Sequence, residues 1–252
     1  MRVGIFTFHR AHNYGAILQA YALMRACVKL GYNTSIIDYA PAYIDNQYHY
    51  FKLCNDLKIN LLKLYNFKGN LEKNRKFNAF RKEYMVITPF NTSEKFDCLL
   101  YGSDQIWNPD IMPGFDKVYF GEHNITSKRN IAYAASIGKS EFSKWESREF
   151  SDAVSYMDAV SVREETACNL IQTFLDKNIE TVIDPTLLLD SQEWLEIAIR
   201  PKMDKRYILV YEVNKYPETM RIAEELSKKT GYPIVEIVYN KTRFDSSHKI
   251  LN

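Results

Sequence analysis

This sequence of 252 residues has little of several features that would assign a protein to a special class. Its four cysteines lie tens of residues apart and form no C-x-x-C pair, so they predict neither a zinc site nor a disulfide framework. No window reaches the roughly 18 apolar residues of a membrane-spanning helix, and the apolar run after Arg2 is too short for the core of a signal peptide. We therefore expect a cytoplasmic protein without a metal site and without an integral membrane segment.

The sequence also has little net charge and few glycines. A formal charge of +2 gives no reason to expect nucleic acid or a membrane surface as the main partner. The first polar turn, His9–Gly15, contains a single glycine and lacks the G-x-G-x-x-G fingerprint, which argues against a bound NAD or FAD. The composition is 46% apolar and 25% charged, which is typical of a globular protein that can bury a core.

Strand-like and helix-like segments alternate along the chain. Val3 to Phe8 is expected to be a strand, Ala16 to Leu30 has helical periodicity, and Thr34 to Ile37 resumes as a strand. Further strands are expected at 96–101, 131–135, 159–162 and 181–183, with helices at 71–84, 144–157 and 163–174. This alternation predicts an α/β fold with a Rossmann-like parallel sheet covered by helices. Residues 41–67 show no clear period and predict short helices at most.

A polar segment that contains a proline, 200–206, is interpreted as a linker. A helix at 218–229 between strands at 207–213 and 234–238 then predicts the first βαβ unit of a second domain. We predict an N-terminal domain over 1–199 and a βαβ unit over 207–252. Two strands and one helix cannot close a core of their own, so the second domain is expected to be incomplete in this chain.

The densest polar cluster follows the strand at 96–101. Its members are Ser103, Asp104, Gln105, Trp107 and Asn108, which supply a hydroxyl, a carboxylate, two amides and an indole. In an open parallel sheet, a loop just past the carboxyl end of a strand faces the crevice where ligands bind. We therefore predict that this loop carries the functional site.

Three other polar turns are expected at the same edge of the sheet, after the strands at 3–8, 131–135 and 159–162. Their candidate residues are His9, His12, Asn13, Gly15, Ser136 and Arg163. The first turn opens a helix whose free N–H groups can hold an anion. We expect all four turns to converge on one pocket.

The sequence resembles the polysaccharide pyruvyl transferase family in five segments that follow the family's order. They are H-N-Y-G-A with L-Q-A-Y-A-L within 12–23, G-S-D-Q-I-W-N-P at 102–109, A-Y-A-A-S at 132–136, S-V-R-E at 161–164 and D-P-T-L-L-L at 184–189. The resemblance extends from residue 1 to about residue 213. A Ser-Phe-His-Gly segment, which the family carries in its C-terminal domain, does not occur here.

This resemblance implies a GT-B-like architecture of two Rossmann-like domains. It also implies an enzyme that moves the pyruvyl group of phosphoenolpyruvate onto two hydroxyls of a hexose in a polysaccharide precursor, forming a cyclic ketal. Phosphoenolpyruvate is then a co-substrate, no cofactor is implied, and the partner is a saccharide acceptor. If that acceptor is lipid-linked, the charged segment Glu72–Lys76 is a candidate contact with the inner membrane. The alternatives are a sugar-nucleotide glycosyltransferase of the same shape and an inactive, sugar-binding remnant.

Ketal formation sets chemical requirements for the candidate residues. The two anionic groups of phosphoenolpyruvate need arginine or backbone N–H groups, and Arg163 is the candidate clamp. Proton transfer and an oxocarbenium-like centre call for acid–base groups and a nearby carboxylate, for which Asp104 and His12 are the catalytic candidates. Gln105 and Asn108 are expected to orient sugar hydroxyls.

Each candidate also has a purely structural interpretation. Asp104 can be a helix N-cap, and Arg163 can be paired with a neighbouring acid. Trp107 is either an apolar platform for a sugar ring or a side chain packed beneath the loop. His9 and His12 can be acid–base or substrate-binding groups, or this turn, with Asn13 and Gly15, can have only a structural role.

Overall fold

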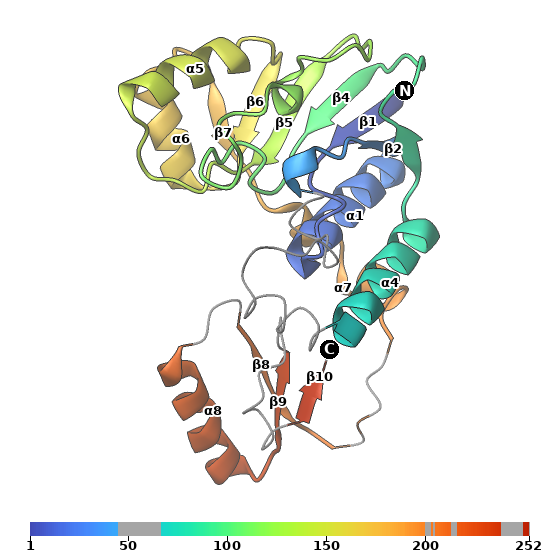
Figure 1. The fold of residues 1–252 in the computed structure, drawn as a ribbon, viewed down its shortest axis with the longest axis vertical. Helices are drawn as coiled ribbons and strands as arrows, with labels where there is room; N and C mark the ends of the chain where they lie inside the picture. The colour runs from blue at the N-terminus through green and yellow to red at the C-terminus, as the bar shows by residue number, and fades with distance from the viewer. Residues whose placement is uncertain (45–66, 200–202, 204, 213–215, 238–248, 252) are drawn as a thin grey trace. The chain divides into compact units, whose positions relative to one another are not determined.

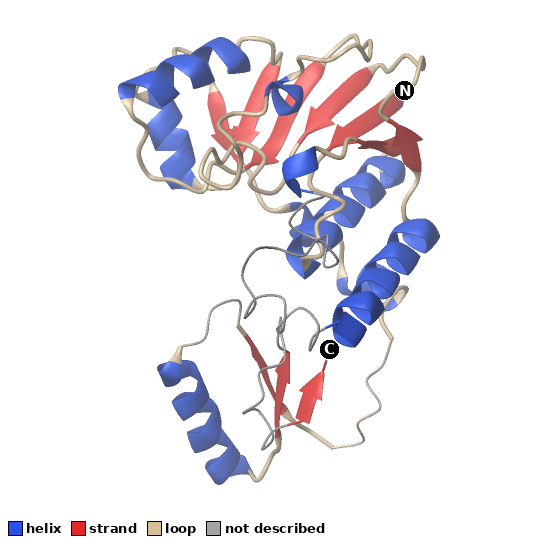
Figure 2. Cartoon of the chain, viewed as in Figure 1, coloured by secondary structure: helices blue, strands red, loops and turns tan. Residues whose placement is uncertain are grey.

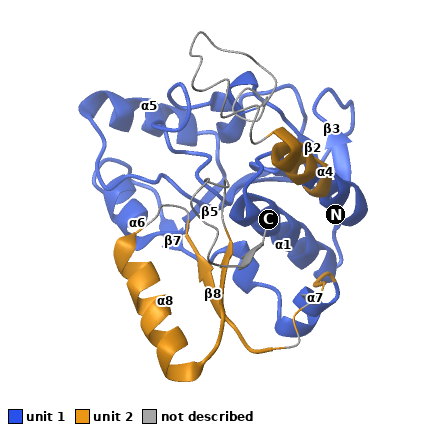
Figure 3. Ribbon diagram, turned by 60° about the horizontal axis from the view of Figure 1, so that its bottom comes forward, with its two compact units in different colours: residues 1–49, 77–196 blue, residues 50–76, 197–252 orange. Residues whose placement is uncertain are grey.

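The computed structural model describes residues 1–44, 67–199, 203, 205–212, 216–237 and 249–251. The chain divides into two units, residues 1–49 with 77–196 and residues 50–76 with 197–252 (Figure 3). The predicted short helices of 41–67 and most of the predicted linker lie outside the described residues. The domain limits expected from the sequence, 1–199 and 207–252, therefore stay a prediction.

A parallel sheet of seven strands forms the centre of the first unit (Figures 1 and 2). Its strands are β1 Arg2–Phe6, β2 Asn33–Asp38, β3 Ile87–Pro89, β4 Cys98–Tyr101, β5 Asn130–Ala135, β6 Ala159–Val162 and β7 Ile179–Thr181. Their order in space is β3-β2-β1-β4-β5-β6-β7, and every neighbouring pair is parallel. The predicted α/β fold with a Rossmann-like sheet is confirmed.

Helices lie between these strands along the chain. They are α1 Tyr14–Lys29, α4 Phe67–Tyr84, α5 Lys144–Val154, α6 Glu165–Gln172 and α7 Ser191–Leu195, with short 3-10 helices η1 Lys117–Phe120 and η2 Pro185–Leu187. α1 begins at Tyr14 because the side chain of Asn13 accepts the N–H of Ala16 at 3.2 Å. α5 begins with a capping box between Ser143 and Glu146. α1 packs against β2, and α6 packs against β6 and β7.

The order of the strands reverses between β1 and β4. From β1 the chain adds β2 and β3 on one side, and it then adds β4 to β7 on the other. Phe6 and Tyr101 are paired in register, so β1 and β4 end at the same level. Loops that leave two such strands diverge and open a crevice at this switch point. The predicted site loop therefore starts at the place in the sheet best suited to hold a ligand.

The second unit contains a parallel sheet of three strands in the order β10-β9-β8. These are β8 Ile208–Tyr211, β9 Ile234–Ile237 and β10 Lys249–Leu251, and helix α8 Pro217–Thr230 connects β8 to β9. Val210, Ala223 and Ile234 form its buried cluster. Gly231 ends α8 in the left-handed conformation, with φ of 70°.

Several strands differ from the prediction in their bounds, and two were not predicted at all. β3 and β10 were not predicted, because segments of three residues are too short to show a period of two. β10 corrects the expectation of only two strands in the second unit. β7 covers 179–181 and not 181–183, because its pairing with β6 joins Val160 to Ile179 and Val162 to Thr181.

Candidate active site at the switch point

The loop after β4 turns sharply at its first residue. Gly102 has φ of 127°, and a Cβ atom at this position would lie 2.1 Å from the carbonyl oxygen of Tyr133. The Gly102–Ser103 peptide bond is cis, and Asp104 has φ of 67°. The carboxylate of Asp104 accepts the N–H of Gln105 at 2.8 Å. Glycine is therefore needed where the loop passes β5, and Asp104 follows in the left-handed region.

Backbone hydrogen bonds join this loop to the next two turns. The N–H of Ser136 donates to the carbonyl oxygen of Asp104 at 2.9 Å, and the N–H of Trp107 donates to that of Ser136 at 3.2 Å. The N–H of Arg163 donates to the carbonyl oxygen of Ala135 at 3.3 Å. The turns after β4, β5 and β6 therefore lie side by side. That they share one pocket with the turn after β1 stays a prediction.

Two serine hydroxyls in these turns are buried and available for bonding. Ser103 and Ser136 have no exposed surface, and neither Oγ atom has a hydrogen-bond partner among the described residues. The hydroxyl of Tyr119 on η1 is also buried and has no hydrogen-bond partner among the described residues. Buried polar groups in native proteins are nearly always satisfied. These hydroxyls are therefore suited to bind polar atoms of a ligand.

Asp104 and Arg163 interact electrostatically. Burial raises the pKa of Asp104, while its bond from the Gln105 N–H and the charge of Arg163 oppose that increase. The guanidinium of Arg163 contacts Asp184 at 2.8 Å and Glu164 at 3.0 Å. Arg163 is thus paired with two acids, as its structural interpretation proposed. Its Nη2 has no partner among the described residues and remains available to an anion.

Trp107 does not present a surface to a ligand. The side chain is fully buried, its ring stacks on Phe120 at a centroid distance of 5.0 Å, and its indole N–H donates to the carbonyl oxygen of Tyr119 at 3.1 Å. The predicted role as a platform for a sugar ring is therefore wrong in this structure. The indole instead anchors the loop from beneath.

Asn108 and Gln105 bond to each other. The amide Nδ2 of Asn108 donates to Oε1 of Gln105 at 2.9 Å, and its Oδ1 accepts the N–H of Asp110 at 2.9 Å. Gly138 packs closely over this pair, since a Cβ there would lie 2.3 Å from Nδ2 of Asn108. Asn108 is thus mainly occupied in shaping the loop. The amide nitrogen of Gln105 has no partner among the described residues and can reach a ligand.

The candidates in the turn after β1 make contacts with residues other than Asp104. His9 is buried, with Nε2 2.9 Å from a carboxylate oxygen of Asp38. The ring of His12 is buried against Phe77 of α4, with a centroid distance of 5.4 Å. Asp104 has no hydrogen bond to either histidine. Asn13 caps α1, and Gly15 is exposed in its first turn.

A buried glutamine, which the sequence analysis did not single out, connects the two loops at the switch point. Nε2 of Gln19 donates to Oγ1 of Thr7 at 2.8 Å, and its Oε1 accepts the N–H of Ser103 at 3.2 Å. Oγ1 of Thr7 also donates to the carbonyl oxygen of Ser103 at 3.2 Å. The signal in the sequence is a glutamine on the apolar face of α1, because a buried amide needs partners.

A tyrosine cluster beside this loop was also not predicted. The hydroxyls of Tyr39 and Tyr43 both donate to Oδ2 of Asp116, at 2.8 and 2.6 Å. Burial, together with the charge of Asp116, raises the pKa of both tyrosines. These hydroxyls are therefore neutral donors that hold the segment before η1 in place.

Two kinds of feature are absent from the part of the chain that the structure describes. Among the described residues, no group of three or more His, Cys, Asp or Glu side chains is placed to hold a metal ion. None of the described helices combines the length and apolar character needed to cross a bilayer.

Comparison with known proteins identifies a family for this chain. A family model described as polysaccharide pyruvyl transferase matches residues 13–252. Comparisons with curated proteins and with solved structures give no significant match.

Proposed function

We propose a reaction for this chain on the premise that it belongs to the polysaccharide pyruvyl transferase family. The chain is therefore an enzyme, and its family acts on a polysaccharide acceptor. In the proposed reaction the donor is phosphoenolpyruvate, and the product is a cyclic ketal on two hydroxyls of a hexose. The observation that carries this proposal is the partly buried carboxyl of Asp104 at the switch point, beside the turn that holds Arg163.

The bond changes define what the site must supply. The methylene carbon of phosphoenolpyruvate takes up a proton, and the adjacent carbon becomes an oxocarbenium-like centre. One sugar hydroxyl bonds to that carbon, inorganic phosphate leaves with the electron pair of the broken C–O bond, and the second hydroxyl closes the ketal. Of the two hydroxyl protons released, one balances the proton taken up at carbon and the other leaves with phosphate. A group that exchanges protons near neutral pH is therefore required.

Asp104 is the candidate for this group because it is a carboxyl in the loop at the switch point and burial raises its pKa. The charge of Arg163 favours the carboxylate form, which stabilises the oxocarbenium-like centre. The buried hydroxyls of Ser103 and Ser136 and the amide of Gln105 supply hydrogen bonds for acceptor hydroxyls. Arg163 provides the cation that attracts the donor, and His12 stays a second candidate for proton transfer.

Replacing the carboxyl of Asp104 tests this proposal. We expect Asp104→Asn to lower the rate of phosphate release from phosphoenolpyruvate, with a saccharide acceptor present, by about 100-fold or more. Asp110→Asn is the matched control, since Asp110 lies on the same loop but its side chain is 63% exposed. Circular dichroism and Tm should be unchanged in both variants. Full turnover by Asp104→Asn would remove Asp104 from the mechanism.

A comparison of donors tests the reaction itself. The chain is incubated with a panel of hexosides and either phosphoenolpyruvate or nucleotide sugars. Formation of inorganic phosphate, together with a new ketal methyl signal in the proton NMR spectrum, is the expected result. Release of a nucleoside diphosphate from a nucleotide sugar would instead identify a glycosyltransferase.

A further inference from the structure

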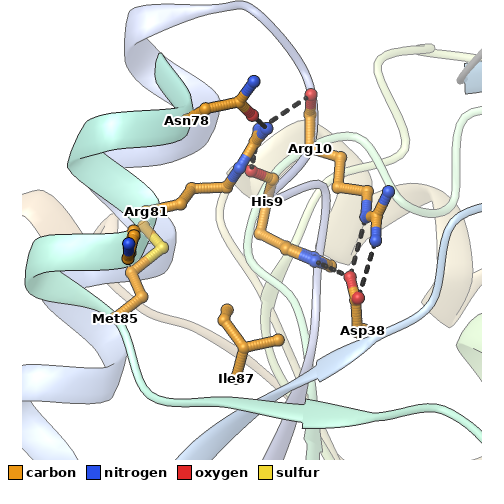
Figure 4. Close-up of a pocket in the computed structure, with 8 residues that line it drawn as sticks. His9, Arg10, Asp38, Asn78, Arg81, Met85 and Ile87 are labelled. Atoms are coloured by element: carbon orange, nitrogen blue, oxygen red, sulfur yellow. Dashed lines mark hydrogen bonds and ion pairs between the residues drawn. The ribbon is translucent and has the colours of Figure 1, made fainter. Parts of the chain in front are cut away.

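A cavity lies on the other side of the switch point from Asp104, between α4 and the carboxyl ends of β1 and β2 (Figure 4). It has a volume of about 430 Å³, and we call it the α4 pocket. The residues that line it are His9, Arg10, Asp38, Asn78, Arg81, Lys82, Met85 and Ile87. This volume lies within the usual range for pockets that bind small molecules.

Asp38 is the only acid in the lining, and two basic side chains are directed at it. Nε and Nη2 of Arg10 donate to its two oxygens at 2.7 and 2.6 Å, and Nε2 of His9 lies 2.9 Å from Oδ1. These hydrogen bonds hold the pKa of Asp38 well below its usual range, so the carboxylate is charged. A single acid therefore faces the basic groups of the pocket and fixes the position of two of them (Figure 4).

The ring of His9 is held at both nitrogens. Nδ1 lies 3.1 Å from the carbonyl oxygen of Thr7, and Nε2 faces the carboxylate of Asp38. Both of these oxygens accept hydrogen bonds. The two contacts therefore fix the ring of His9 in the wall of the pocket, beside Asp38.

Two more basic side chains come from the last turn of α4. Nη1 of Arg81 donates to the carbonyl oxygens of His9 and Arg10 at 3.3 and 3.2 Å, and Nη2 donates to Asn78. Lys82 is exposed and makes no ion pair with a described residue. The lining therefore combines four basic side chains with one acid.

We propose that the α4 pocket binds a phosphate ester on the saccharide acceptor, an inference that rests on the proposed function. A phosphate offers several charged oxygens, and guanidinium and ammonium groups bind such oxygens most strongly. Met85 and Ile87 add an apolar wall beside the charged one. The pocket is therefore suited to a ligand with an anionic group and a larger, less polar body.

The position of the pocket favours the acceptor over phosphoenolpyruvate. Asp38 ends β2, whereas Arg163 follows β6, and four inter-strand steps of about 4.8 Å separate those strands by roughly 19 Å. One molecule of a three-carbon acid cannot bridge that distance. Asp104 follows β4, only two steps from β2, or roughly 10 Å. A phosphorylated saccharide can therefore place its hydroxyls near Asp104 and its phosphate in the α4 pocket.

Calorimetric titration of the full chain with hexose 1-phosphate tests the proposal. We expect Lys82→Glu to raise the Kd for hexose 1-phosphate by about tenfold, the effect of losing one hydrogen bond to a charged group. Lys68→Glu is the matched control, because it makes the same charge change at an exposed position of α4 outside the lining, and its Kd should equal that of the parent chain. Circular dichroism verifies that both variants are folded.

Two further ligands test whether the phosphate belongs to a lipid-linked saccharide and whether the pocket binds phosphoenolpyruvate instead. A hexose joined through a diphosphate to a short isoprenyl chain should lose affinity with Lys82→Glu as well, and tighter binding than hexose 1-phosphate would identify a lipid-linked acceptor. An equal Kd for hexose 1-phosphate in the parent chain and Lys82→Glu would overturn the proposal. A Kd for phosphoenolpyruvate that rises with Lys82→Glu would overturn it too, because the pocket would then serve the donor.

Because the measurement is binding, it separates this proposal from the proposed reaction. Binding of hexose 1-phosphate that depends on Lys82, without pyruvyl transfer from phosphoenolpyruvate, would reject the reaction and keep the phosphate site. Pyruvyl transfer combined with binding that does not depend on Lys82 would reject the phosphate site and keep the reaction.

Discussion

Two aspartates on opposite sides of the switch point show how the same side chain acquires opposite properties. Asp104, after β4, has no ion pair among the described residues, and burial raises its pKa against the opposing charge of Arg163. Asp38, at the end of β2, receives hydrogen bonds from His9 and Arg10, which lower its pKa. A carboxyl whose largest influence is burial is held less firmly in its charged form, whereas one hydrogen-bonded to basic side chains stays ionised and fixes their positions. The first environment suits proton transfer, and the second suits anion binding.

The largest expected effect comes from a substitution of Gly102, the first residue of the loop that carries Asp104. Gly102→Ala would place a Cβ atom 2.1 Å from the carbonyl oxygen of Tyr133, in a region of positive φ, so we expect a loss of about 3–5 kcal/mol in the free energy of unfolding. Gly69→Ala is the control, because no atom lies within 4 Å of its added Cβ in α4, and it should stabilise by about 0.5–1 kcal/mol. Urea denaturation measures both. Equal stability of the two variants would contradict the close approach.

A smaller effect is expected from removing the hydrogen bonds by which Gln19 connects the loops after β1 and β4. Gln19→Met keeps the size of the side chain but leaves Oγ1 of Thr7 and the N–H of Ser103 without their partner, so we expect a loss of about 1–3 kcal/mol. Gln172→Met, at an exposed position near the end of α6, should change the stability by less than about 0.5 kcal/mol. Thermal unfolding followed by circular dichroism distinguishes the two. A Gln19→Met variant as stable as the control would mean that the loops are held without this bridge.

The smallest expected effect is the contribution of Asp38 to the free energy of unfolding, which depends on pH. Because the pKa of Asp38 is lower in the folded chain than the value of about 3.9 for an unfolded chain, its contribution is fully present above about pH 4 and is lost as the pH falls toward the folded pKa. Asp38→Asn should therefore be less stable than the parent chain by about 1–2 kcal/mol near pH 6, and the difference should narrow between about pH 4 and pH 2.

Urea denaturation across that pH range provides the measurement. Asp152→Asn, at an exposed position of α5, is the control and should remain close to the parent chain throughout. A stability difference for Asp38→Asn that stays constant down to about pH 2 would show that the carboxylate charge does not hold His9 and Arg10.

Most of the fold could be predicted from local patterns. Helical periodicity located α1 and α8, and polar turns after short apolar runs located β4, β5 and β6. The same turn chemistry identified the loop at 103–108. The three-residue strands β3 and β10 were missed because their hydrogen bonds come from neighbouring strands and not from a pattern within the segment.

The candidate site was less predictable, because burial depends on what packs against each side chain. Trp107 has the composition of a ligand platform but lies beneath its loop, against Phe120. Gln19 looked like an ordinary helical residue, although it bonds to two loops. Asp38 ends a strand that was predicted correctly, yet its role depends on Arg10 and on the basic turn of α4 across the pocket.

The sequence by itself determined the alternation of strands and helices, the polar loop after β4 and the family resemblance, because periodicity and turn chemistry act between residues close together in the chain. Only the tertiary structure decided that β1 and β4 are neighbours, so that Thr7 bonds to Ser103 across 96 positions. It also decided the direction of each aspartate's pKa shift. Charge and solvation depend on groups that only folding brings together.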